Sequence, residues 1–202
     1  TFGEDIDSRS ETFLAEGYRL YMETLNHRRK GAGDDGGSAT ASQNYAMAAY
    51  PWSVFNFFHT FRSATGKNIA LEWPDVSFLP GYLYWNMLPG RREFGAGDAY
   101  HSTNELSLGN MRAHILQIIN FYGSLEPRGA GFAKWMLSRV PQGNYGSFPL
   151  LPFLLTERRD DLEPLPPANV MPFARHFENM GQVFMRSGPG PEDTYALFMC
   201  GG

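Results

Sequence analysis

Residues 163–172 read EPLPPANVMP and hold four prolines in ten positions. Proline removes a backbone donor and cannot continue a helix, so this stretch predicts a linker. Before it the apolar residues follow a helical spacing, and after it they follow strand-like runs. The sequence therefore predicts a helical part at 1–162, a linker at 163–173 and the start of a β-sheet domain at 174–202.

Two strands are predicted after the linker. Residues 182–186 and 194–199 are short apolar runs, and the turn-rich sequence SGPGPED at 187–193 joins them. Two strands alone do not form a stable sheet. We therefore expect an antiparallel sheet that continues beyond residue 202.

Two long helices are predicted in the first third of the chain. Ser8 and Glu11 fit a capping box, and Leu14 is the first of four apolar residues on one helix face. Residues 45–61 are apolar nearly all round, which is typical of a buried helix, and Gly66 is the expected C-cap.

Further helices are predicted at residues 78–87, 111–122 and 132–139, the second of them closed by Gly123. The predicted fold class is therefore mainly α. A short apolar piece at 148–155 is also expected to be helical, although two prolines interrupt it.

Composition bounds the function classes. The net charge of −4 and the absence of a basic stripe argue against a nucleic-acid partner. The single cysteine excludes an internal disulfide. Neither a membrane-spanning run nor a signal peptide is evident, and the chain does not begin with Met, so a mature, processed or truncated chain is expected.

Few residues stand out for chemistry. Tyr45 lies at the mouth of a predicted helix, and Asp98 and His101 lie in the glycine-rich loop GAGDAYHS. Each also has a structural interpretation: a core tyrosine, a turn-capping Asp and a polar loop histidine. We expect His59 to be a packed core residue and His114 to lie on the surface. No sequence motif typical of a metalloprotease, serine hydrolase or nucleotide site occurs.

Three stretches together resemble the heparinase II/III superfamily, and heparinase II most of all. Residues 36–69 resemble the family's loop, catalytic tyrosine and long helix, which places that tyrosine on Tyr45. Residues 89–102 end in the Gly-Asp pair that falls on Asp98. Residues 174–202 are similar to the entry into the sheet domain, including the pattern G-x-x-x-x-R-[ST]-G-x-G around Arg186.

The resemblance implies a fold, an activity and roles for residues. The helices would form part of an (α/α) toroid of hairpins, and the enzyme would be a polysaccharide lyase acting by β-elimination on uronic-acid polymers. Tyr45 would donate a proton to the leaving oxygen and, for some epimers, serve as base, while Asp98, His101 and Tyr50 would bind the substrate. Tyr50 is close enough to Tyr45 in sequence to be the alternative match to the family's catalytic tyrosine. Arg186 would brace the interface between helices and sheet.

The resemblance also implies binding partners, a cellular location and a cofactor requirement. The partners would be an acidic polysaccharide and the remainder of the same polypeptide, with no nucleic acid and no membrane, in the periplasm or outside the cell. No cofactor is expected in this chain, and a structural metal would belong to the sheet domain beyond residue 202. The 202 residues alone would be inactive, because the family's site is completed from outside them.

Two other functions remain open. A glycoside hydrolase on an (α/α) toroid would need two carboxylates, for which Asp35 and Asp98 are the loop candidates. A non-catalytic carbohydrate-binding homologue would keep the fold without the site. The sequence does not select one uronate polymer.

Overall fold

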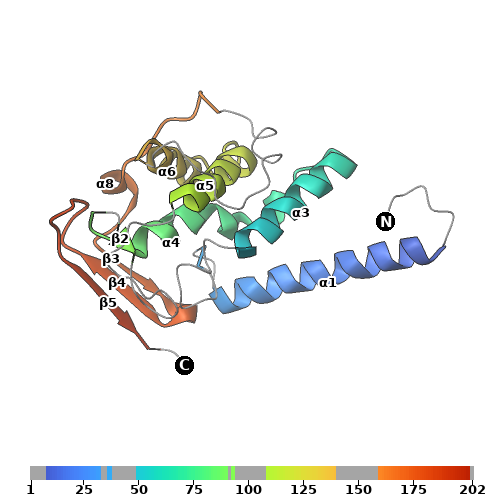
Figure 1. The fold of residues 1–202 in the computed structure, drawn as a ribbon, viewed down its shortest axis with the longest axis horizontal. Helices are drawn as coiled ribbons and strands as arrows, with labels where there is room; N and C mark the ends of the chain where they lie inside the picture. The colour runs from blue at the N-terminus through green and yellow to red at the C-terminus, as the bar shows by residue number, and fades with distance from the viewer. Residues whose placement is uncertain are drawn as a thin grey trace.

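The structure is a computed structural model that describes residues 8–32, 36–37, 49–90, 92–93, 108–139 and 159–200. It is mostly helical, with a small antiparallel sheet near the C-terminus (Figure 1). The α-helices are α1 (Ser8–Ala32), α3 (Ala49–Thr65), α4 (Leu79–Trp85), α5 (Leu108–Tyr122), α6 (Pro127–Arg139) and α8 (Pro167–Val170). Three 3-10 helices are η1 (Ile69–Glu72), η2 (Pro74–Phe78) and η3 (Glu178–Met180). The strands are β1 (Met87–Leu88), β2 (Arg92–Glu93), β3 (Ala174–Phe177), β4 (Gln182–Arg186) and β5 (Tyr195–Met199).

The helix ends confirm the predicted terminators. Gly66 takes a left-handed φ of 73° and donates its backbone N–H to the carbonyl of Arg62 at 2.8 Å. Gly123 donates likewise to Ile119 at 3.1 Å after α5. Both contacts satisfy carbonyls that the helix leaves open at its C-terminal end. Residues 148–155 lie outside the described residues.

The helices pack as antiparallel hairpins. Tyr21 of α1 stacks on Phe57 of α3, whereas Tyr18, one turn earlier, reaches the later Phe61. Helices α5 and α6 turn back on each other across residues 123–126. Across the hairpins, α3 and α5 run parallel, because His59 pairs with Gln117 and Arg62 with Asn120.

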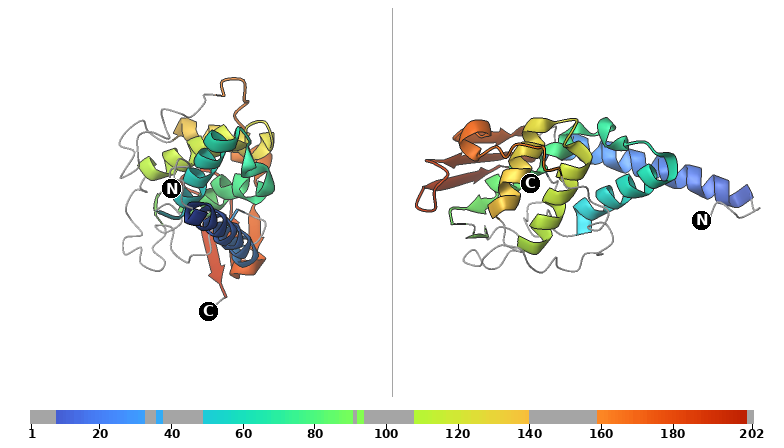
Figure 2. Two further views of the ribbon diagram at one scale, coloured as in Figure 1. Left: turned by 90° about the vertical axis from the view of Figure 1, so that its right-hand side faces the viewer. Right: turned by 90° about the horizontal axis from the view of Figure 1, so that it is seen from above.

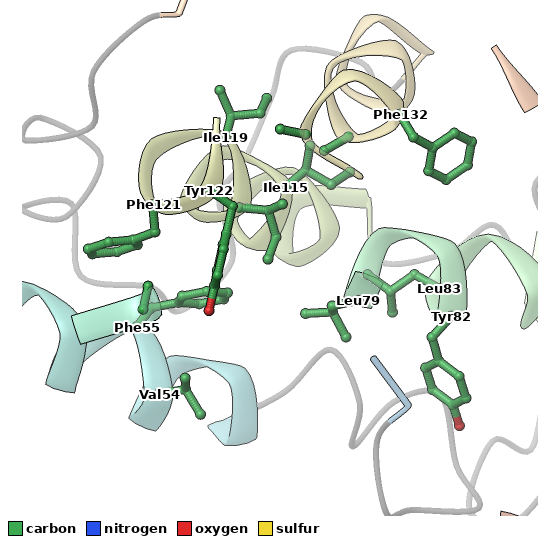
Figure 3. Close-up of a cluster of buried hydrophobic side chains, with 14 of the residues drawn as sticks. Val54, Phe55, Leu79, Tyr82, Leu83, Ile115, Ile119, Phe121, Tyr122 and Phe132 are labelled. Carbon is green, nitrogen blue, oxygen red and sulfur yellow. The ribbon is translucent and has the colours of Figure 1, made fainter. Parts of the chain in front are cut away.

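The core lies where α3, α4 and α5 meet. Phe55 of α3, Leu79 and Leu83 of α4, and Ile115 and Tyr122 of α5 converge there (Figure 3). The prediction that the helix at 45–61 is buried on all sides is wrong for its described part, since Asn56 and Thr60 are exposed. Polar residues at these two positions mark the solvent face that the aromatic run had obscured.

Helix α1 is only half packed. Leu25 is buried and Tyr21 lies against α3, but Leu14, on the same predicted face, is 66% exposed, as is the neighbouring Phe13. The first half of α1 projects beyond the other described elements (Figure 2). The amphipathic spacing correctly predicted the helix. Among the described residues, however, other elements pack only against its C-terminal half.

His114 is a correction. We expected it at the surface, but it is fully buried in α5 and its ring lies 6.0 Å from that of Phe55. Gln117 is fully buried and Asn120 nearly so at successive turns of the same face. This buried polar stripe faces α3, where His59 Nε2 donates a 2.6 Å hydrogen bond to Oε1 of Gln117. His59 packs against α5 but is only half-buried, so the prediction of a packed core residue is confirmed in part.

The sheet has three antiparallel strands in the order β3-β4-β5. Strands β4 and β5 match the two predicted runs, and β3 is an additional strand that the sequence analysis did not identify. Phe177 of β3 and Phe184 of β4 face the helices, at 5.3 Å from Tyr82 and 6.2 Å from Trp85 between ring centroids. The sheet and the helices therefore share one hydrophobic core.

The proline-rich segment is docked rather than extended. Within 163–173, the short helix α8 forms, and Pro167 is buried. The backbone N–H of Leu165 donates to the carbonyl of Gly131 on α6 at 2.9 Å. This contact holds the connection between helices and sheet along α6.

Arg186 joins the sheet to the helices, as predicted. Its Nη2 donates to the carbonyl of Tyr84 at 2.8 Å and to that of Met87. Its guanidinium carbon lies 4.7, 5.7 and 5.0 Å from the ring centroids of Tyr84, Trp85 and Tyr195. Cation–π attraction and charge-assisted hydrogen bonds act here in a largely desolvated place, where both are strong.

Replacing Arg186 by Lys should lower the free energy of unfolding by about 1.5 to 3 kcal/mol, because an ammonium cannot reproduce the planar contacts with rings and carbonyls together. Urea unfolding followed by circular dichroism measures the change. Arg19→Lys is the control: Arg19 forms only exposed ion pairs with Glu16 and Glu23, so its replacement should leave stability unchanged. Equal effects of the two substitutions would refute the bracing role.

His59 should make stability depend on pH. Burial lowers its pKa, an effect that the hydrogen bond with Gln117 opposes and the charge of Arg62 reinforces. The unfolded state, with an ordinary histidine pKa of about 6.5, therefore binds the proton more readily than the folded state. The contribution of His59 to the free energy of unfolding should therefore be fully present above about pH 6.5 and decrease as the pH falls below it. Urea midpoints at pH 7.5 and 5.5 should differ more for the natural protein than for His59→Gln; parallel shifts would contradict this.

Candidate functional site

The predicted site residues lie mostly outside the described part of the chain. Tyr45, Asp98 and His101 all fall in undescribed ranges, as does Asp35 of the alternative hydrolase. Tyr50 belongs to the first turn of α3, but its side chain is not described. The arrangement of these side chains therefore lies outside the described residues, and their roles stay predictions.

A groove of about 770 Å³ opens between the end of α6, the turn after β1, the α8 segment and the β4–β5 connection. Its walls include Tyr84, Trp135, Arg139 and Arg186, together with five prolines that stiffen them. These are Pro89, Pro166, Pro167, Pro189 and Pro191. A rigid, partly aromatic groove of this size can hold a chain of small rings.

Two arginines, Arg139 and Arg186, line the groove, although the chain as a whole carries a net charge of −4. No acidic residue is among the described lining residues, but the carboxylate of Asp193, which accepts a hydrogen bond from the backbone of Gly190, attracts Arg186. Burial lowers the pKa of Arg186, but a guanidinium with an ordinary value above 12 stays charged at neutral pH. The groove is therefore suited to an anionic ligand.

Trp135 and Arg139 form one wall. They lie four residues apart on α6 and so share a helix face. The Arg139 guanidinium carbon is 5.6 Å from the Trp135 ring centroid, and Phe132 stacks on the same tryptophan at 5.7 Å. The sequence analysis missed this pair, although the spacing W-x-x-x-R within a predicted helix could have revealed it.

Tyr84 links the wall to the floor of the groove. Its ring packs edge-on against Trp135 at 6.5 Å and under Arg186 at 4.7 Å. Burial raises the pKa of Tyr84, an effect that the charge of Arg186 partly opposes, so the phenol stays protonated at neutral pH. The floor thus combines a fixed cation with a neutral ring.

The groove lies beside the start of the predicted substrate loop. Strand β1, which contributes Met87 and Leu88 to its lining, pairs with β2 in the register Met87↔Glu93 and Leu88↔Arg92. After β2 the chain continues toward Asp98 and His101. The hairpin therefore connects the groove to the loop that the sequence analysis singled out.

The segment that leads to Tyr45 is anchored at Gly36. This glycine has a φ of 71° and is buried against the backbone of η2 and α4. A Cβ at this position would lie 2.5 Å from the amide nitrogen of Leu79, well inside van der Waals contact. Only glycine combines this backbone conformation with this close approach.

No metal centre or membrane helix is found in the part of the chain that the structure describes. No group of three or more His, Cys, Asp or Glu side chains among these residues could hold a metal ion. None of the described helices combines the length and apolar character needed to cross a membrane.

Comparisons with known proteins gave no match: no family model, no curated protein and no solved structure corresponds to the chain. The likeness to the heparinase II/III superfamily therefore rests on the three sequence stretches alone. Function has to be inferred from those stretches and from the groove.

Replacing Gly36 by Ala should destabilise the fold by more than about 2 kcal/mol, through backbone strain and the clash with Leu79 together. Gly66→Ala is the matched control, because Gly66 has nearly the same φ but nothing within 4 Å of an added Cβ, so about 1 kcal/mol of strain alone is expected. Urea unfolding of both variants measures the difference. A Gly36→Ala protein no less stable than Gly66→Ala would show that the close packing is absent in solution.

Proposed function

We propose that the chain is part of a polysaccharide lyase that cleaves uronic-acid polymers by β-elimination. The observation that carries the proposal is the groove that two arginines line, with no acidic residue among its described lining residues. The chain that lines it at β1 continues in sequence through β2 toward Asp98. An acidic polysaccharide is a ligand that matches both the charge and the length of the groove. The heparinase II/III-like stretches supply the reaction type.

The helix arrangement supports an (α/α) toroid as the larger fold. Such a toroid is built from antiparallel helical hairpins. Helices α1 and α3 form one antiparallel pair, and α5 and α6 form another. The exposed Leu14 on α1 is what a helix shows when a further hairpin would cover it.

The outer face of the small sheet supports a larger sheet domain. Met185 and Phe198 point away from the helices and are exposed, the second by 59%. We propose that the remainder of the polypeptide covers this face and that any structural metal is bound there. A periplasmic or secreted location follows from the proposed substrate, which is an extracellular polymer.

β-Elimination needs hydrogen-bond donors for the carboxylate, a base for the C5 proton and an acid for the leaving oxygen. The C5 proton of a uronate is weakly acidic, and its removal builds charge on the C6 carboxylate, which prepositioned hydrogen-bond donors must neutralise. Tyr45 would protonate the departing O4, a role that suits a phenol with an ordinary pKa near 10. Asp98, His101 and Tyr50 would orient the sugar.

The test of the reaction uses the complete protein that contains these residues. Incubation with alginate, heparan sulfate, polygalacturonate and ulvan should yield a new ultraviolet absorbance from unsaturated uronate with at least one polymer. New reducing ends without that absorbance would instead indicate a hydrolase. Binding without cleavage would indicate a carbohydrate-binding module.

Tyr45→Phe in the complete protein should slow elimination by roughly 10²- to 10⁴-fold, because one proton transfer is lost. Polymer binding should change far less, since the ring remains. Initial rates of absorbance increase, measured with saturating polymer, give the effect. Thermal melts should show that the variant is folded.

Tyr50→Phe is the matched control for this experiment. A normal Tyr45→Phe enzyme beside an inactive Tyr50→Phe enzyme would move the proton transfer to Tyr50. Full activity in both variants would remove tyrosine from the mechanism.

A further inference from the structure

We propose that a second cavity, at the N-terminal end of α6, is a binding site for an apolar carboxylate such as a short- or medium-chain fatty acid. The cavity has a volume of about 370 Å³ and lies between η2, α4, the first turns of α6 and residues 170–177. This volume lies within the range of small-molecule sites. The cavity shares no lining residue with the groove, and the proposal is independent of the lyase activity.

The walls of this cavity are mostly apolar. Its two hydroxyl side chains are already engaged, since Ser77 donates to the carbonyl of Pro74 at 2.6 Å and Tyr82 forms hydrogen bonds with the side chains of Asn86 and Gln182. A sugar would leave several hydroxyls without partners here, whereas a hydrocarbon chain would not. Rings and aliphatic side chains form the rest of the wall: Phe78, Trp85, Phe132, Val170, Met171, Pro172 and Phe177.

Gly81 keeps one side of the cavity open. It lies in α4, and a Cβ built on it would meet only the Cε of Met171, at 3.1 Å, among atoms outside its own helix. The helix therefore presents bare backbone to the cavity at this position. Met171 on the facing segment is a flexible side chain that can adapt to a ligand.

Arg128 gives the cavity a cation at its rim. It is exposed and lies one turn before Phe132 on α6, so both side chains border the cavity from one helix face. Arg128 forms no hydrogen bond or ion pair with the residues that the structure describes. The carboxylate of Glu126 accepts a hydrogen bond from the backbone of Gly129 at 3.4 Å and is not among the described lining residues. Arg128 can therefore hold the carboxylate of a ligand whose hydrocarbon part fills the cavity.

A second arginine, Arg175 of β3, borders the same cavity. Its guanidinium carbon lies 5.6 Å from the ring centroid of Phe177, and the side chain is half-buried and engaged in a further contact. The proposal therefore assigns the ligand carboxylate to Arg128 alone.

Isothermal titration of the complete protein with butanoate, hexanoate and octanoate, below the concentration of micelle formation, tests the site. Affinity should rise roughly 3-fold for each added methylene, because each one transfers from water to the apolar walls. The neutral 1-octanol should bind more weakly than octanoate, because it has the same chain without the charge.

Arg128→Gln should weaken octanoate binding roughly 2- to 10-fold and leave 1-octanol binding unchanged. Gly81→Leu, whose side chain would enter the cavity, should weaken the binding of both ligands. Lys67→Gln is the control for charge, since Lys67 is an exposed cation that does not line the cavity, and it should change neither affinity. Thermal melts check that the variants are folded.

The absence of octanoate binding, or an affinity that does not depend on chain length, would overturn the site. Equal losses in Arg128→Gln and Lys67→Gln, or an unchanged affinity in Arg128→Gln, would remove the assignment of the carboxylate. If Gly81→Leu does not fold, the comparison of Arg128→Gln with Lys67→Gln still decides. Formation of unsaturated uronate is measured separately, so the lyase proposal and this site can each fail alone.

Discussion

The guanidinium of Arg186 is the interaction on which the relation between sheet and helices depends. It leaves β4, passes between the rings of Tyr84, Trp85 and Tyr195, and ends on the carbonyl of Tyr84 in the last turn of α4 and on that of Met87 in β1. Carbonyls in the last turn of a helix lack the donors that the next turn would supply. One side chain thus satisfies the end of α4 and sets the distance between α4 and the β4–β5 pair.

The groove is a consequence of that distance. Its floor is Tyr84 and Arg186, and its far wall is the turn-rich connection that follows Arg186. Within that connection Asp193 accepts hydrogen bonds from Ser187 and from the backbone of Gly190, which gives the wall a defined shape. Through the contact of Tyr84 with Trp135, the same aromatic series continues to Arg139. The stability of the sheet docking and the geometry of the groove are therefore carried by the same residues.

Local sequence patterns predicted the positions of several helices and strands. They did not predict which of these elements contact one another. Gly66 and Gly123 terminate helices by backbone geometry alone, and the run at 187–193 predicts a turn, so α3, α5, β4 and β5 were predictable. His114 was placed wrongly because its burial depends on α3 lying across α5, which no local pattern states. The groove joins segments near residues 84–90, 135–139, 166–168 and 186–191, whose proximity follows only from the packing. The interpretation of Arg186 came from a family resemblance, and its contacts agree with it.

The two groove arginines show how an acidic chain can present a cationic surface without an isolated buried charge. A desolvated guanidinium is costly unless its hydrogen bonds and its charge find partners, and Arg186 finds two carbonyls and three rings. None of these partners carries a formal negative charge, and the nearby carboxylate of Asp193 offsets part of the charge of Arg186. Arg139 is exposed, and its guanidinium lies against the ring of Trp135. Both groove arginines therefore contact aromatic rings, one in a buried place and the other at the surface.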